Sequence, residues 1–178
     1  MAHPFLGLSS RQRHHLFWLT LGLTVLAMAV LQIIDAPLKT AAAPLGVVSF
    51  ALAGTSARAT AILQSWDAHA RLHAAFSLGF DYLFMLAYAS AIALAALWVG
   101  EGDGARLGRL GEAAAWGAGL AGVADAAENH FLWRLLLGVA PERYPFWARW
   151  AAMIKFAILA AALGYVCAAL VIRMLRKR

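Results

Sequence analysis

The chain of 178 residues is 63% hydrophobic and 13% charged, and a soluble domain of this length could not expose so much apolar surface. We therefore predict an integral membrane protein. The formal net charge of +6 does not indicate nucleic-acid binding, because the basic residues gather at the ends of apolar segments and not on an aromatic-interleaved patch. Cys167 is the single cysteine, which excludes an intrachain disulfide, a Cys-x-x-Cys redox pair and a cysteine-based zinc site.

The first predicted span covers residues 16–34 and follows a basic segment at residues 11–15. A basic segment before an apolar run is also typical of a signal peptide, and residues 41–43 offer small side chains for cleavage. The apolar run is longer than a typical signal-peptide core, and Asp35 and Pro37 interrupt the chain before the alanines. We therefore expect a retained transmembrane helix.

Residues 36–67 are too apolar for an ordinary loop and end in a stretch with helical periodicity. Thr55 or Ser56 is a suitable N-cap residue for this helix. Four apolar side chains would share one helical face: Ala59, Ile62, Leu63 and Trp66. We predict an interfacial amphipathic helix that rests on the outer bilayer surface as a connector, with a lid over a site as the alternative.

Three further apolar segments are long enough to cross the bilayer, because about 20 helical residues span its hydrocarbon core. They cover residues 70–99, 113–137 and 147–174. Together with residues 16–34 they predict an all-α protein, a four-helix transmembrane bundle with the interfacial segment between its first two spans. We expect a single membrane domain over residues 1–178.

The distribution of basic residues predicts the orientation of the chain. One side of the membrane receives the arginines and lysines of residues 11–13, 106–109 and 173–178, whereas those of the other side are spread over longer segments. By the positive-inside rule both termini are cytoplasmic, and we expect a bacterial inner membrane. Tryptophans near the span ends fit an outer aromatic belt of Trp66, Trp133, Trp147 and Trp150 and an inner belt of Trp98 and Trp116.

Five polar or ionisable residues lie well inside the predicted spans: Asp81, Asp125, Glu128, Asn129 and Lys155. A charge at the bilayer centre costs about 2.5–3.5 kcal/mol even on insertion scales, so such a residue normally faces a protein interior and has a partner. At about 100° per residue, Asp125, Glu128 and Asn129 share one helical face, whereas His130 lies about 140° away from Asp125. Distances along the helices allow all five residues to share one layer, in the outer half of the bilayer.

Side chains on the other two helices are expected to face the same site. Tyr88 shares one side of its helix with Asp81, Ser77 and Met85. Lys155 lies in a stripe of small residues, which allow close approach of a neighbouring helix. We predict a ligand-binding site formed by Asp81, Tyr88, Asp125, Glu128, Asn129 and Lys155.

Counting charges indicates what this site could do. Three carboxylates would face one lysine, and in a low-dielectric interior the excess negative charge requires a proton, a bound cation or a cationic ligand group. Glu128 or Asp125 is the candidate catalytic acid/base group, Lys155 the charge-balancing group and Asn129 an orienting donor. In the structural alternative, the buried pairs only fix the register of the helices.

Histidines offer two weaker candidates for a site. Haem ligation by two of His69, His73 and His130 is conceivable, but nothing else in the sequence indicates a haem crevice. A catalytic metal needs three convergent ligands, for which Asp81, Glu128 and His73 are the candidates. We assign no metal to the site, and its cofactor stays unknown.

The sequence Gly117-Ala-Gly-Leu-Ala-Gly122 matches the dinucleotide-binding pattern Gly-x-Gly-x-x-Gly. That pattern requires a preceding strand, whereas this one lies within a predicted spanning helix. Its small residues indicate close packing between helices.

Two functions are consistent with these observations. In the first, the site binds or acts on a membrane-soluble amphiphile (a lipid, an isoprenoid or a quinone) or transfers protons, with membrane lipid as the expected partner. In the second, the chain is an accessory subunit of a larger energy-transducing or transport complex, with membrane proteins as partners and a purely structural charged cluster. No motif decides whether the protein is an enzyme, and no nucleic-acid partner is expected.

Overall fold

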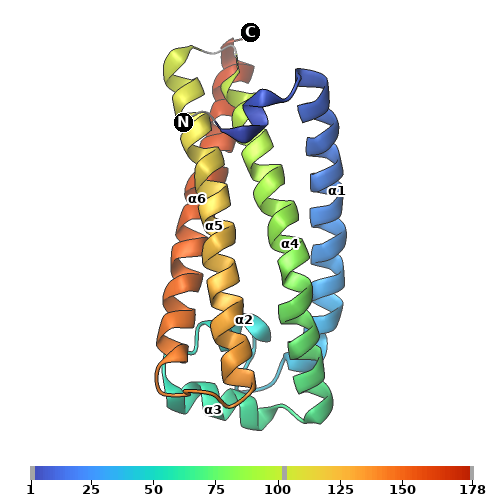
Figure 1. The fold of residues 1–178 in the computed structure, drawn as a ribbon, viewed down its shortest axis with the longest axis vertical. Helices are drawn as coiled ribbons and strands as arrows, with labels where there is room; N and C mark the ends of the chain where they lie inside the picture. Colours follow the sequence, from blue (N-terminus) through green and yellow to red (C-terminus); the bar gives the residue numbers. More distant parts are fainter. Residues whose placement is uncertain (1–2, 102–103, 177–178) are drawn as a thin grey trace. The chain divides into compact units, whose positions relative to one another are not determined.

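A computed structural model describes residues 3–101 and 104–176, so Lys177 and Arg178 of the predicted cytoplasmic terminus lie outside the described residues. Every regular element within these two ranges is helical, which confirms the all-α prediction (Figure 1). The elements in chain order are η1 (Pro4–Gly7), α1 (Ser10–Asp35), η2 (Ala36–Leu38), α2 (Val47–Ala51), α3 (Ser56–Ser65), α4 (Ala68–Gly100), α5 (Ala105–Leu136) and α6 (Tyr144–Arg176).

Within the described residues, three helical segments are long and apolar enough to cross a membrane. They are Ser10–Leu38, which joins α1 to η2, together with α4 and α6. These segments are compatible with an integral membrane protein. The remaining predicted span corresponds to α5, which has 32 residues but is interrupted by charged side chains. Its role as a fourth span stays a prediction.

The chain divides into two compact units. Unit 1 comprises Met1–Thr24, Leu86–Gly122 and Lys155–Arg178, and unit 2 comprises Val25–Met85 and Val123–Ile154. Each of the four long helices therefore contributes one portion to each unit.

The core of unit 2 forms where the two short helices meet the ends of the long ones (Figure 1). Its large, fully buried side chains include Phe50 of α2 and Ile62 of α3. They pack among alanines such as Ala74 of α4 and Ala148 of α6, both 0% exposed. Small side chains on the long helices thus leave room for large ones from the connecting segment.

The amphipathic helix predicted between the first two spans is α3. Thr55 is its N-cap, and its side-chain oxygen accepts a hydrogen bond from the Arg58 N–H at 3.3 Å. Ala59 and Ile62 are buried, which confirms the predicted apolar face. This face packs into the protein core of unit 2, and the position of α3 relative to a membrane surface stays a prediction.

The assignment of Trp66 to the outer aromatic belt is wrong, because its side chain is only 2% exposed. Its ring packs against Phe50, with the ring centroids 5.2 Å apart. Its indole N–H donates to the Leu38 carbonyl oxygen at 2.9 Å, so the one polar atom of the side chain is satisfied inside the protein. The remaining belt candidates are each more than 40% exposed: Trp98, Trp116, Trp133, Trp147 and Trp150.

A carboxylate joins the end of α1 to the start of α2. Asp35 Oδ1 accepts a hydrogen bond from the Val47 N–H at 2.8 Å. Gly46 precedes Val47 with φ = +57°, and a Cβ atom built on it would lie 2.1 Å from Asp35 Oδ2. A side chain at this position would therefore meet both backbone strain and a steric clash.

Replacing this glycine tests the turn. We expect Gly46→Ala to lower the free energy of unfolding in detergent by about 2–4 kcal/mol, because alanine is strained here and displaces the Asp35 carboxylate. The matched control is Gly79→Ala on α4, where an added Cβ has open space, and it should stabilise by up to about 1 kcal/mol. Equal effects of the two substitutions on thermal or denaturant unfolding would contradict the prediction.

Unit 1 has a smaller core, built mainly from alanines of α4 and α5. A Cβ atom at Gly111 of α5 would lie 2.6 Å from the Ala96 carbonyl oxygen of α4, so the two backbones approach closely there. Tyr165 of α6 packs against this core, and its hydroxyl donates to the Leu107 carbonyl oxygen at 2.9 Å. Close contact through small residues is typical of helix packing in membranes.

His3 anchors the segment before α1 to unit 1. Its backbone N–H donates to Glu112 Oε1 at 2.8 Å, and its ring lies edge-on to Trp116 with centroids 5.0 Å apart. Ring Nδ1 accepts a hydrogen bond from the Phe5 N–H at 3.3 Å, which requires an unprotonated Nδ1. Burial lowers the pKa of His3 below its ordinary value, against the opposing effect of the Glu112 charge.

The lowered pKa predicts that acid loosens this anchor. Because the pKa of His3 is lower in the folded chain than in the released segment, the anchor is fully stable above pH 6.5 and weakens as pH falls through the folded pKa. Hydrogen exchange at the Phe5 amide, corrected for its intrinsic rate, should speed up below that pH. His3→Asn retains an acceptor but does not titrate, so it should remove the pH dependence. An unchanged pH profile in this variant would contradict the prediction.

Candidate functional site

One face of α5 is polar and buried in unit 2. Asp125, Glu128 and Asn129 are 2%, 5% and 4% exposed, and Leu132, one turn further on, is 1% exposed. His130 is exposed, although it follows Asn129 directly. The face predicted from helical spacing is therefore confirmed, and the exposed histidine lies outside it.

Asp81 of α4 meets this face through a hydrogen bond. Asn129 Nδ2 donates to Asp81 Oδ2 at 2.6 Å, a short distance typical of hydrogen bonds to a carboxylate. On the same stretch of α4, the Tyr82 hydroxyl donates to the Ala126 carbonyl oxygen at 3.5 Å, which is at the limit of a hydrogen bond. The amide–carboxylate pair is thus the stronger of these two polar links between α4 and α5.

Two predicted site residues belong to unit 1. Tyr88 of α4 and Lys155 of α6 are buried, with 5% and 8% exposure. The Lys155 ammonium lies 4.8 Å from the centroid of the Phe156 ring, within the range of a cation–π interaction. Its predicted small-residue stripe is buried at Ala152 and Ala162. Membership of both residues in one site with the acidic cluster stays a prediction.

The polar residues of unit 2 form what we call the acidic cluster, defined as Asp81, Asp125, Glu128 and Asn129. Most basic residues of the same unit lie at exposed positions, whereas Arg134 is half-buried. The exposed ones are Lys39, Arg58, Arg71, Arg143 and Arg149. Chemically, the cluster offers carboxylate oxygens that can accept hydrogen bonds, exchange a proton or balance a cationic group.

Of the histidines proposed as metal or haem ligands, His69 and His73 lie near the start of α4, whereas His130 lies on α5. The ring centroids of His69 and His73 are 4.5 Å apart, and His73 Nδ1 lies 3.1 Å from the Ile34 carbonyl oxygen. Within residues 3–101 and 104–176, no group of three or more His, Cys, Asp or Glu side chains is arranged to hold a metal ion.

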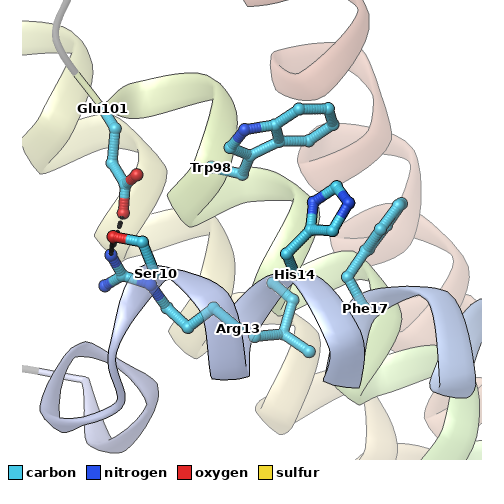
Figure 2. A pocket seen from close by; sticks show the side chains of 7 residues that line it. Ser10, Arg13, His14, Phe17, Trp98 and Glu101 are labelled. Carbon is cyan, nitrogen blue, oxygen red and sulfur yellow. Dashed lines mark hydrogen bonds and ion pairs between the residues drawn. The ribbon is translucent and has the colours of Figure 1, made fainter.

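A second polar site, which was not predicted from the sequence, lies in unit 1. A cavity of about 200 Å³ opens between α1 and α4, and we call it the α1–α4 pocket (Figure 2). It is lined by Ser10, Arg13, His14, Phe17, Leu94, Trp98 and Glu101. The residues of α1 follow the spacing i, i+3, i+4 and i+7 of one helical face, a signal that the sequence carries. The position of Arg13 before an apolar span predicts only a role in membrane topology.

Comparison with known proteins gives no family assignment for this chain. No protein-family model matches the sequence, and no curated protein or solved structure matches it significantly.

The Asn129–Asp81 pair can be tested by substitution. We expect Asn129→Leu to lower the free energy of unfolding by about 1–3 kcal/mol, because the half-buried Asp81 carboxylate loses a hydrogen-bond donor. Tyr82→Phe removes only the 3.5 Å bond and should cost less than about 0.5 kcal/mol. In the double variant Asn129→Leu/Asp81→Leu, the carboxylate that lost this amide donor is removed as well, so part of the loss in unfolding free energy should be recovered. Simple addition of the two single effects would show that the pair is not coupled.

Proposed function

We propose that the protein crosses a bacterial inner membrane four times, with α1, α4, α5 and α6 as spans and both termini in the cytoplasm. The distribution of side chains around α5 supports its role as a span. Its acidic residues Asp125 and Glu128 are buried, whereas large side chains at Leu120, Val123 and Trp133 are exposed by 42% or more. A helix with polar groups toward protein and apolar groups outward suits a lipid environment.

Within this arrangement, we propose that the acidic cluster binds the polar head of a membrane-soluble amphiphile, namely a lipid, an isoprenoid or a quinone. The observation that carries the proposal is the 2.6 Å bond from Asn129 to Asp81, beside two buried carboxylic acids on the same helix. Asn129 holds the Asp81 carboxylate in place. Asp125 and Glu128 then supply groups that can accept a hydrogen bond from the head group or exchange a proton with it.

The charge of the cluster favours a ligand that brings a proton or positive charge. Removing a carboxylate from water is costly unless hydrogen bonds or an opposite charge compensate it. Asp125 and Glu128 add two buried acidic groups on α5 to the amide–carboxylate pair. Alternatively, the acidic cluster transfers protons through Glu128 or Asp125. This function uses the same groups and needs no tightly bound ligand.

The alternative function, an accessory subunit of a larger membrane complex, is favoured by a different observation. In the most apolar stretch of each helix, 11% of the residues are buried in α1 and 17% in α6, compared with 56% in α4. The outward surfaces of α1 and α6 are therefore available to lipid or to other membrane proteins. Polypeptides that co-purify with the chain, without any small ligand, would support this alternative.

Native mass spectrometry of the protein purified in mild detergent tests the proposed function. We expect a retained small molecule in the wild type and about a tenfold loss of it in Glu128→Gln, which removes a charge but preserves shape. The matched control is Glu142→Gln, because Glu142 is an exposed glutamate of the same unit. Retention that is equal in both variants would exclude Glu128 from the binding site.

A further inference from the structure

The α1–α4 pocket lies at the ends of two membrane-length helices. Ser10 is the first residue of α1, and Glu101 directly follows the last residue of α4. Trp18 and Trp98 lie near these ends and are 55% and 45% exposed, as expected of side chains at a membrane–water boundary. If α1 and α4 span the bilayer, the pocket lies at the depth of the lipid head groups.

One side of the pocket is ionic. Arg13 forms an ion pair with Glu101, and its Nη2 also lies 3.4 Å from the Ser10 hydroxyl. The Arg13 side chain is 17% exposed and that of Glu101 is 41% exposed. Within the described residues these polar contacts of Arg13 use Nη2, which leaves its Nε and Nη1 donors for a ligand. A guanidinium of this kind can bind phosphate through two donors.

The other side of the pocket is aromatic (Figure 2). The Trp98 ring lies 6.1 Å from the His14 ring and 6.0 Å from the Phe17 ring, measured between centroids. His14 Nε2 accepts a hydrogen bond from the Trp18 indole N–H at 3.0 Å. Because the indole N–H is only a donor, this bond uses His14 Nε2 as the acceptor, and Nδ1 is the ring atom that can donate to a ligand. The indole face of Trp98 can attract a cation.

We propose that the α1–α4 pocket binds the phosphate–ammonium head group of a zwitterionic phospholipid such as phosphatidylethanolamine. Arg13, with the Ser10 hydroxyl and the His14 Nδ1–H, binds the phosphate. Glu101 and the Trp98 ring bind the ammonium group. The acyl chains remain in the bilayer alongside the helices.

Size and charge both favour this ligand. The volume of about 200 Å³ is below the range of about 300–1,000 Å³ that pockets for drug-sized ligands occupy, so it suits a head group better than a whole amphiphile. One arginine and one glutamate make the ionised side chains neutral in sum, which matches a zwitterion. An anionic head group would bring phosphate close to Glu101 without an ammonium group to compensate that charge. This site involves different residues from the acidic cluster, so it goes beyond the function proposed above.

The test uses native mass spectrometry of the full chain in detergent with equal amounts of phosphatidylethanolamine and phosphatidylglycerol of identical acyl chains. We expect the wild type to retain about tenfold more phosphatidylethanolamine, and Arg13→Gln and Trp98→Leu to reduce its retention to about a tenth. Arg11→Gln is the matched control, because Arg11 is an exposed arginine on the same helix and lies outside the pocket. It should retain the wild-type lipid pattern.

A reversal of selectivity separates binding from misfolding. Glu101→Gln removes the ammonium partner and leaves Arg13, so this variant should prefer phosphatidylglycerol, an outcome that loss of fold cannot produce. The proposal is overturned if the wild type retains both lipids equally, if Arg11→Gln loses as much lipid as Arg13→Gln, or if Glu101→Gln keeps the wild-type preference. Displacement of the lipid by an equal concentration of free O-phosphoethanolamine would assign the pocket to a soluble ligand and overturn its assignment to lipid.

Discussion

A polar group inside an apolar helix must find its partner within the protein, and this constraint organises both units. Thr20 satisfies it locally, since its hydroxyl donates to the Leu16 carbonyl oxygen at 2.8 Å on its own helix. Asn129 satisfies it between helices, through the Asp81 carboxylate. Because an unmet hydrogen bond costs far more in an apolar medium than in water, such pairs restrict which helices can be neighbours and in which register.

Small residues provide the second condition, because polar pairs can form only where helices approach closely. Gly111 brings the backbone of α5 against the Ala96 carbonyl oxygen in unit 1. In unit 2 the alanines of the long helices leave space that Phe50 and Ile62 fill from the connecting segment. That segment therefore contributes large side chains to the core, and it is more than a link between the first two long helices.

Features that depend on local spacing could be predicted from the sequence, whereas those that depend on contacts between distant segments could not. Helical periodicity was sufficient to place Asp125 and Glu128 on a buried face. Residue type limited the N-cap of α3 to Thr55 or Ser56, and the structure shows that it is Thr55. Amphipathic spacing also predicted that Trp66 faces the apolar side of its helix, but an apolar side can face lipid or protein equally well. Only the tertiary structure shows that protein covers it.

The same limit applies to the two polar sites. Periodicity groups Asp125, Glu128 and Asn129, but it does not say that the amide of Asn129 is directed to Asp81. The ion pair between Arg13 and a glutamate at the far end of α4 arises from the packing of two helices. Charge patterning alone assigned that arginine to membrane topology, because a basic residue before an apolar span serves that role in most sequences.

The burial of Trp66 also distinguishes its fluorescence from that of the other tryptophans. The chain has seven tryptophans, of which six are 42% or more exposed and one is 2% exposed. Quenchers carried on lipid chains or dissolved in water can reach the six exposed indoles, but they cannot reach the one enclosed between α2, α3 and η2. Its residual emission therefore reports on the core of unit 2 without any added label.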